Sequence, residues 1–96
     1  MLVESDEQRL IETKLTTIRT YLANKFPGYT VTERAFPNLY HTFTVSNIEL
    51  HKSYGLKVDW SRLSDPRNTP DRIWSALTGG FVASAMVNAG DLYYSW

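Results

Sequence analysis

Residues 48–60, IELHKSYGLKVDW, alternate in character over their whole length, and this stretch decides the predicted fold. The even positions, from Ile48 to Trp60, are apolar or long-stemmed, whereas the odd positions, from Glu49 to Asp59, are polar or glycine. A period of two is typical of a β-strand with one buried side and one solvent-facing side. The thirteen residues exceed the usual strand length of roughly 3–10 residues, so we expect a bulge or bend near residues 53–55.

Two shorter stretches before it, residues 29–35 and 39–45, alternate in the same way. Pro37 and Asn38 predict a turn over residues 36–38, and residues 46–47 can form a two-residue hairpin loop. With these loops, the apolar sets of all three strands fall on one face. A slip of one residue would move a whole set to the other face, so the pattern predicts an antiparallel three-stranded meander.

A helix is predicted over residues 5–26, upstream of the strands. Ser5 and Gln8 have the spacing of a capping box, and Pro27-Gly28 ends the helical pattern. An apolar stripe with steps of three and four residues identifies the buried face; it consists of Ile11, Leu15, Ile18 and Leu22. Lys14 and Arg19 lie away from that stripe and are expected to face solvent.

A second helix is predicted from about Pro70 to Asn88. Thr69, Pro70 and Asp71 form a typical helix start, whereas residues 61–69 before them read as a loop. The helix is apolar nearly all round, which predicts burial on more than one side. Gly79-Gly80 is a point where it can bend or pack very closely.

The predicted fold class is therefore α+β, with the order α-β-β-β-α in a single domain over residues 1–96. Both helices are expected to pack on one face of the sheet. The tail, residues 91–96, DLYYSW, alternates again. It predicts either a short C-terminal strand or an aromatic clamp on the core.

Composition limits the classes of function. Cysteine is absent, which excludes disulfides, thiolate catalysis and cysteine-based zinc sites. Ten basic and ten acidic residues cancel, whereas general nucleic-acid and membrane-surface binders usually carry excess positive charge. Residues 1–10 are acidic and lack the apolar stretch of a secretory signal, and the uncharged residues 73–89 are short for a membrane span. We expect a cytoplasmic protein that does not enter a membrane.

The strand register predicts one row of charged side chains, Glu33, His41 and Lys52, across the apolar face of the sheet. An acid, an imidazole and an ammonium group side by side can shift one another's pKa. The row could bind a small ligand, or it could be a structural charge row with Lys52 extending to solvent. It is also the only group of residues that suits a catalytic role, since no motif for nucleophile, metal or phosphate chemistry is present. We predict no cofactor and no metal.

Arginine recurs every five residues at Arg62, Arg67 and Arg72, close to the predicted start of the second helix. Guanidinium groups and free backbone N–H groups there could bind phosphate or another anion. Asp65 and Asp71 are interleaved with them and could instead pair with them locally.

Small residues and aromatic residues suggest a surface for self-association, which would give a homodimer. Small side chains four positions apart allow close helix packing, and aromatic side chains are enriched at interfaces. The candidate residues are Ala76, Gly80, Ser84, Tyr93, Tyr94 and Trp96. The alternative is that the helix packs on its own sheet and the tail covers the rest.

The polar face of the predicted sheet completes the set of candidate surfaces. It carries Thr30, Thr32, Arg34, Tyr40, Thr42, Thr44, His51, Lys57 and Asp59. Such a face can bind a protein or a nucleic acid, and it is also typical of any solvated sheet. We predict a small non-enzymatic domain that binds a protein partner, which can be a second copy of itself. The alternative is nucleic-acid or phosphate binding through residues 62–72 and this polar face.

Overall fold

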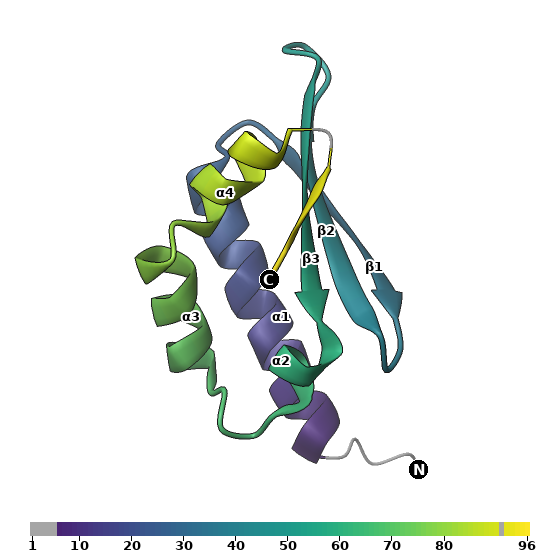
Figure 1. The fold of residues 1–96 in the computed structure, drawn as a ribbon, viewed down its shortest axis with the longest axis vertical. Coiled ribbons are helices and arrows are strands. Elements are labelled where there is room, and N and C mark those ends of the chain that lie inside the picture. The colour runs from purple at the N-terminus through teal and green to yellow at the C-terminus, as the bar shows by residue number, and fades with distance from the viewer. Residues whose placement is uncertain (1–5, 91) are drawn as a thin grey trace.

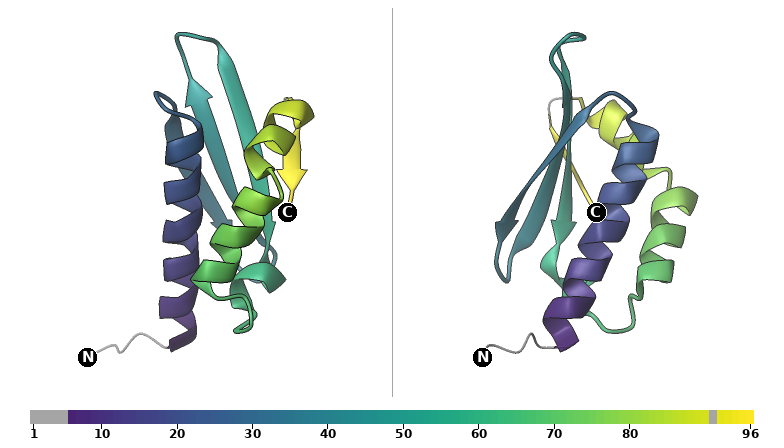
Figure 2. Two further views of the ribbon diagram at one scale, coloured as in Figure 1. Left: turned by 90° about the vertical axis from the view of Figure 1, so that its left-hand side faces the viewer. Right: turned by 180° about the vertical axis from the view of Figure 1, so that it is seen from behind.

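A computed structural model describes residues 6–90 and 92–96 and confirms the predicted α+β class. Figure 1 shows the helices gathered on one side of a single sheet, and the views of Figure 2 show that the other face of the sheet is left uncovered. The four-stranded sheet has the order β1-β2-β3-β4. Its uncovered face is the surface most open to a ligand.

The first three strands form the predicted antiparallel meander, and the tail adds a short fourth strand. These strands are β1 (Thr30–Phe36), β2 (Tyr40–Asn47), β3 (Lys52–Asp59) and β4 (Tyr93–Ser95). β4 pairs in parallel with β3, so that Gly55 is opposite Tyr93. The tail is therefore an edge strand, and its alternation puts Tyr93 and Ser95 on the uncovered face.

The strand register differs from the predicted one, although the assignment of faces is correct. Val45 lies opposite Tyr54 instead of Ile48, and Val31 lies opposite Val45 instead of Phe43. Both shifts are even numbers of residues, and an even shift leaves each side chain on its own face.

Both connections differ from the predicted ones: the β1–β2 loop is residues 37–39 instead of 36–38, and the β2–β3 turn is longer than the predicted residues 46–47. Residues 48–51 form a four-residue connection in which the backbone N–H of Leu50 donates to Oδ1 of Asn47 at 3.0 Å. His51 takes a positive φ of 53° there. The expected bulge near residues 53–55 is absent, because β3 starts only at Lys52 and pairs without interruption to Asp59.

Helix α1 (Asp6–Lys25) follows the predicted span, and its apolar stripe faces the sheet. The predicted capping residue Ser5 lies outside the described residues. Lys14 was expected to face solvent, and this prediction is wrong, because its side chain is fully buried. Its Nζ donates to the carbonyl oxygens of Leu63 at 2.8 Å and Asp65 at 2.7 Å. Burial lowers the pKa of Lys14, and the nearby Asp65 partly opposes that effect.

The carbonyl partners of Lys14 belong to a short helix that was expected to be loop. Helix α2 (Trp60–Ser64) begins where β3 ends, and the side chain of Asp59 accepts from the backbone N–H of Ser61. Asp is a preferred residue at such a helix start. Lys14 satisfies carbonyls at the other end of α2, and Leu63 enters the core. α2 therefore fixes the exit of β3 against α1.

The predicted second helix is divided into α3 (Pro70–Gly79) and α4 (Val82–Ala89). Thr69 caps α3 as expected, with its hydroxyl oxygen accepting from the backbone N–H of Arg72. The chain breaks at Gly80 and Phe81, and Phe81 has left-handed backbone angles with φ 51°. The break lets α3 pack on α1 while α4 packs on β3 and β4.

The core fills the space between the helices and the inner face of the sheet. Its fully buried members come from every layer and include Ile18, Leu22, Phe43, Val45, Leu56, Val58, Leu63, Leu77 and Met86. Within the described residues, no helix combines the length and the apolar character that a membrane crossing requires.

Candidate functional site

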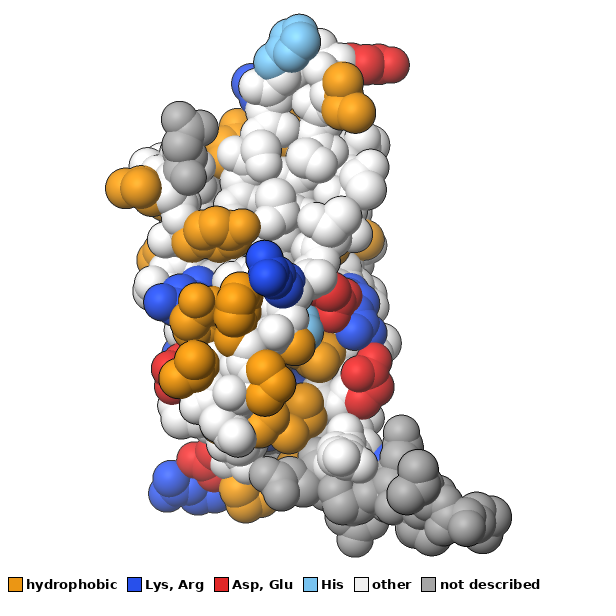
Figure 3. Space-filling model, turned by 90° about the vertical axis from the view of Figure 1, so that its right-hand side faces the viewer, with side chains coloured by type: hydrophobic (Ala, Val, Ile, Leu, Met, Phe, Trp, Pro, Cys, Tyr) orange, Lys and Arg blue, Asp and Glu red, His pale blue; other side chains and the backbone are white. Residues whose placement is uncertain are grey.

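The uncovered face of the sheet carries side chains from all four strands. Figure 3 looks onto the sheet side of the molecule and shows hydrophobic side chains gathered in the middle of the view, with basic side chains beside them. The even-numbered residues of β1 and β2 and the odd-numbered residues of β3 and β4 share this face, because the registers align them. This is the predicted polar face, except that His51 lies in the β2–β3 turn and that Phe36 and Tyr93 join Tyr40 on it.

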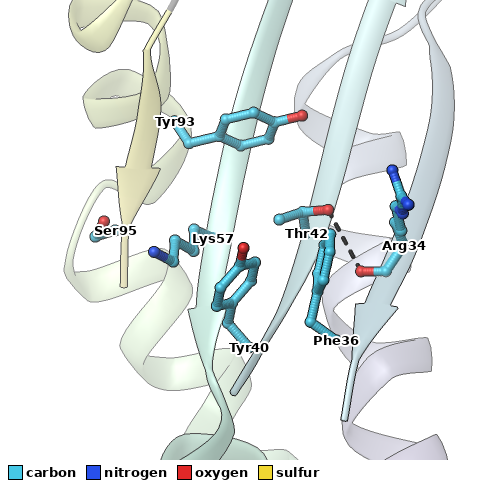
Figure 4. Close-up of a pocket in the computed structure, with 7 residues that line it drawn as sticks. All are labelled: Arg34, Phe36, Tyr40, Thr42, Lys57, Tyr93 and Ser95. Atoms are coloured by element: carbon cyan, nitrogen blue, oxygen red, sulfur yellow. Dashed lines mark hydrogen bonds between the residues drawn. The ribbon is translucent and has the colours of Figure 1, made fainter.

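A hollow of about 390 Å³ lies on this face. Figure 4 shows the residues that line it, which are Arg34, Phe36, Tyr40, Thr42, Lys57, Tyr93 and Ser95. The seven residues belong to four different strands, so the fold of the whole sheet is needed to bring them together.

Cations and aromatic rings are interleaved in this hollow. Lys57 Nζ lies 4.2 Å from the ring centre of Tyr40, and the guanidinium carbon of Arg34 lies 5.1 Å from the ring centre of Phe36. The rings of Phe36 and Tyr40 are themselves 4.6 Å apart. Cation–π contacts at exposed sites hold such side chains in place only weakly, so both cations remain able to turn toward a ligand.

Neither cation has an ion-pair partner among the described residues. Among the described residues, the ion pairs involve Arg19, His41 and Arg67, and none involves Arg34 or Lys57. Asp59 is the nearest carboxylate along β3, and it is already bound to the hydroxyl and backbone N–H of Ser61. The hydrogen bonds from Ser61 lower the pKa of Asp59, with a further contribution from Lys57. The hollow therefore presents two cations to solvent.

Tyr93 forms the upper wall of the hollow and is held at both ends. Its hydroxyl lies 3.0 Å from Oγ1 of Thr44, and its ring covers Gly55, which has no side chain. A Cβ atom on Gly55 would be only 2.3 Å from the Tyr93 ring. Glycine inside a strand often marks such a close approach, and here it lets β4 contribute to the site.

The predicted row of Glu33, His41 and Lys52 forms only in part. Nε2 of His41 lies 3.0 Å from Oε1 of Glu33, although the two residues are diagonal neighbours across β1 and β2 and not directly opposite. Lys52 lies opposite Asn47 at the far end of the hairpin, so its predicted place in the row is wrong. The longer β2–β3 turn is the cause.

The cation beside Glu33 and His41 is Arg19 of α1 and not Lys52. Its guanidinium group makes two hydrogen bonds to Glu33, one of them 2.8 Å long from Nη2, and a third to Glu12 at 2.9 Å. These bonds lower the pKa of Glu33, an effect that burial partly opposes and His41 assists. Because the carboxylate of Glu33 already accepts from a guanidinium and contacts an imidazole, the network is suited to joining α1 to the sheet.

The three predicted anion-binding arginines have different surroundings in the structure. Arg62 places its guanidinium carbon 4.0 Å from the ring centre of Trp96, and Arg67 forms an ion pair with Asp65 at 2.9 Å. That pairing lowers the pKa of Asp65 to about 2. Arg72 is exposed on the first turn of α3. Two of the three guanidinium groups thus already have a partner within the fold.

The predicted interface residues do not form one stripe. Ala76 belongs to α3 and Ser84 to α4, with the break at Gly80 between them. The backbone N–H of Gly80 ends α3 by donating to the carbonyl of Ala76 at 2.9 Å. Tyr94 and Trp96 pack against the core, whereas Tyr93 faces the hollow.

The sequence pattern did not place Phe36, Tyr93 or Ser95 on this face. Phe36 continues the alternation of Thr32 and Arg34, which would have placed it on this face had the turn been set one residue later. Glycine within β3 was the only sign that a ring lies over the sheet. Among the described residues, no three His, Asp or Glu side chains come together as around a metal ion.

Comparison of the chain with protein-family models, with curated proteins and with solved structures finds no match in any of the three. The geometry of the uncovered face is therefore the basis for the functional argument.

Proposed function

We propose that this chain is a non-catalytic protein-interaction domain that binds an acidic segment of a partner protein in the hollow of its uncovered sheet face. The observation that carries the proposal is that two cations, Arg34 and Lys57, lie in one hollow with three aromatic side chains and have no ion-pair partner among the described residues. Carboxylates of a partner would form ion pairs with these two cations.

The kinds of side chain in the hollow support a protein ligand. Tyrosine and arginine are enriched among the residues that contribute most to protein–protein binding, and Tyr40, Tyr93 and Arg34 all line this hollow. The hydroxyl groups of Thr42 and Ser95 add hydrogen-bonding capacity at its rim. An acidic segment with an aromatic or apolar residue would satisfy both the charge and the rings.

Single-stranded nucleic acid is the second candidate, and the interleaved rings and cations are the observation that favours it. Bases stack on aromatic side chains while phosphates contact basic ones. Two cations are few for a backbone with one charge per nucleotide, and the chain as a whole carries no net charge. The protein ligand is therefore the better supported of the two.

Fluorescence anisotropy with two labelled probes tests the proposal. The first probe is a random copolymer of glutamate and tyrosine, and the second is a short oligothymidylate. Lys57→Glu and Arg34→Glu are each expected to weaken binding of the acidic copolymer at least about tenfold, because each replaces attraction by repulsion. Lys52→Glu is the matched control, since it makes the same charge change on an exposed residue at the far end of β3.

If the chain instead prefers the oligothymidylate, and the same two variants lose that binding, the ligand is a nucleic acid and not a protein. Equal losses in all three variants, or no binding of either probe, would contradict a ligand site in the hollow. A cytoplasmic location stays a prediction from the cysteine-free composition.

A further inference from the structure

The turn between β2 and β3 carries exposed apolar side chains away from the body of the domain. Figures 1 and 2 show this hairpin extending beyond the helices and the other strands. We refer to residues 48–51, IELH, as the hairpin tip. Ile48 is 87% exposed and Leu50 is 55% exposed, so neither belongs to the core.

The hairpin tip has a defined conformation. The backbone N–H of His51 donates to the carbonyl of Ile48 at 3.2 Å, and the backbone N–H of Leu50 donates to the side chain of Asn47. These bonds fix the backbone that carries both apolar side chains. A segment that is already ordered loses little conformational freedom when it binds.

A groove lies at the same end of the molecule, where the end of α1 meets α4. It has a volume of about 390 Å³, and we call it the end groove; its lining residues are Lys25, Phe26, Ala83, Ser84, Val87 and Asn88. Its apolar lining consists of Phe26, which is only 6% exposed, Ala83, and Val87, which is 45% exposed. Lys25, on the last turn of α1, puts a positive charge at the rim.

We propose that a second copy of this chain inserts its hairpin tip into the end groove, and that the two copies do so reciprocally around a twofold axis. Ile48 and Leu50 of one copy would bury their side chains against Phe26, Ala83 and Val87 of the other. Glu49, between them in sequence, would meet Lys25. This interface is separate from the hollow of the sheet face.

Charge complementarity and position together favour a second copy as the occupant. The tip pairs apolar side chains with an acid, and the groove pairs an apolar surface with a base, so each matches the other. Both lie at one end of the molecule (Figure 1), which is where a twofold axis can make two identical contacts at once. In such an interface each substitution changes both of the two identical contacts.

Light scattering coupled to size exclusion, over a range of protein concentrations, tests the proposal on the full chain. We expect a dimer that dissociates on dilution, with a mass approaching twice the 11.0 kDa of one chain at high concentration. The double substitution Ile48→Ser and Leu50→Ser is expected to weaken dimerisation at least about tenfold, since it removes four apolar side chains from the interface. Leu39→Ser is the control, because Leu39 is 62% exposed at the opposite end of β2.

A charge exchange makes the test specific to the proposed pairing. Lys25→Glu alone and Glu49→Lys alone are each expected to weaken dimerisation, and the double exchange to restore it. Circular dichroism checks that each variant is folded. A monomer at every concentration would overturn the proposal, and so would a dimer that none of these substitutions affects.

Discussion

The ring of Tyr93 lies over the backbone of Gly55, at the one position of β3 where there is no side chain on the path of the ring. The contact anchors the short strand β4 to the sheet and places the phenol hydroxyl 3.0 Å from Thr44. It also builds one wall of the hollow that we propose as the binding site. Gly55 has no side chain that could bind a ligand, yet its small size is what allows the Tyr93 ring to form this wall of the hollow.

Gly55→Ala is expected to destabilise the fold. Alanine normally suits a strand better than glycine, but here the new methyl group collides with the Tyr93 ring. We expect the free energy of unfolding to fall by about 1–3 kcal/mol, as measured by urea denaturation. The same substitution is expected to cost much less in a Tyr93→Ser background, where the ring is gone. Additive effects of the two changes would contradict the contact.

Glu33→Gln is expected to make the free energy of unfolding less dependent on pH in the acid range. The Glu33 carboxylate has a lowered pKa in the folded state, chiefly because of Arg19. The stability that Glu33 contributes is therefore fully present above the pKa of about 4.3 that a Glu has in the unfolded chain. It is lost as the pH falls through the lower pKa of Glu33 in the folded state. Near pH 7 the variant should be less stable by about 1–2 kcal/mol.

The difference between the Glu33→Gln variant and the unmodified chain should disappear in acid, where Glu33 is protonated. Glu12→Gln is the control, since Glu12 makes one contact to Arg19 and its side chain is 63% exposed. A difference that stays constant from neutral to acid pH would show that Glu33 does not act through its charge.

Lys14→Met is expected to destabilise the fold by about 1–3 kcal/mol, although it replaces a buried ammonium group by an apolar side chain of similar length. The reason is that the carbonyls of Leu63 and Asp65 lose their donor. Lys52→Met, at an exposed strand position that lines neither the hollow nor the end groove, should change stability by less than about 0.5 kcal/mol. Thermal unfolding of both variants compares them directly, and equal stability would contradict a role for Lys14.

Phe81→Gly is expected to raise the free energy of unfolding by about 1 kcal/mol, because left-handed backbone angles are unfavourable for residues other than glycine. Phe81 has φ 51° and is 72% exposed, so the substitution removes little packing. Chemical denaturation is the measurement. A clear loss of stability would mean that the Phe81 ring has a structural role that its exposure does not suggest.

The arrangement of faces could be predicted from the sequence, because a period of two assigns every strand residue to one side whatever the register. The register itself could not. Residues 48–51 continue the alternating pattern and yet form a turn, since Asn47 and the positive φ of His51 close it locally. The error carried Lys52 into the wrong row. Glu33 and His41 do contact each other, but as diagonal neighbours and not as the directly opposite pair that was predicted.

Contacts between distant elements were the other part that the sequence did not reveal. Arg19 on α1 meets Glu33 on β1, and Lys14 reaches the end of α2, because α1 lies across the sheet at an angle that periodicity does not define. Tyr93 reaches the hollow only because β4 pairs in parallel with β3. The sequence therefore placed Arg34, Tyr40, Thr42 and Lys57 on the face that carries the hollow, but not Phe36 or the two residues of β4.

The most direct measurement of the central claim is an NMR titration of the ¹⁵N-labelled chain with the glutamate–tyrosine copolymer. The account predicts that amide shifts concentrate on the strand residues around Arg34, Tyr40, Lys57 and Tyr93, that they saturate, and that they weaken as salt is added. Shifts confined to the helices or the hairpin tip, or no shifts at all, would contradict a binding site on the uncovered sheet face.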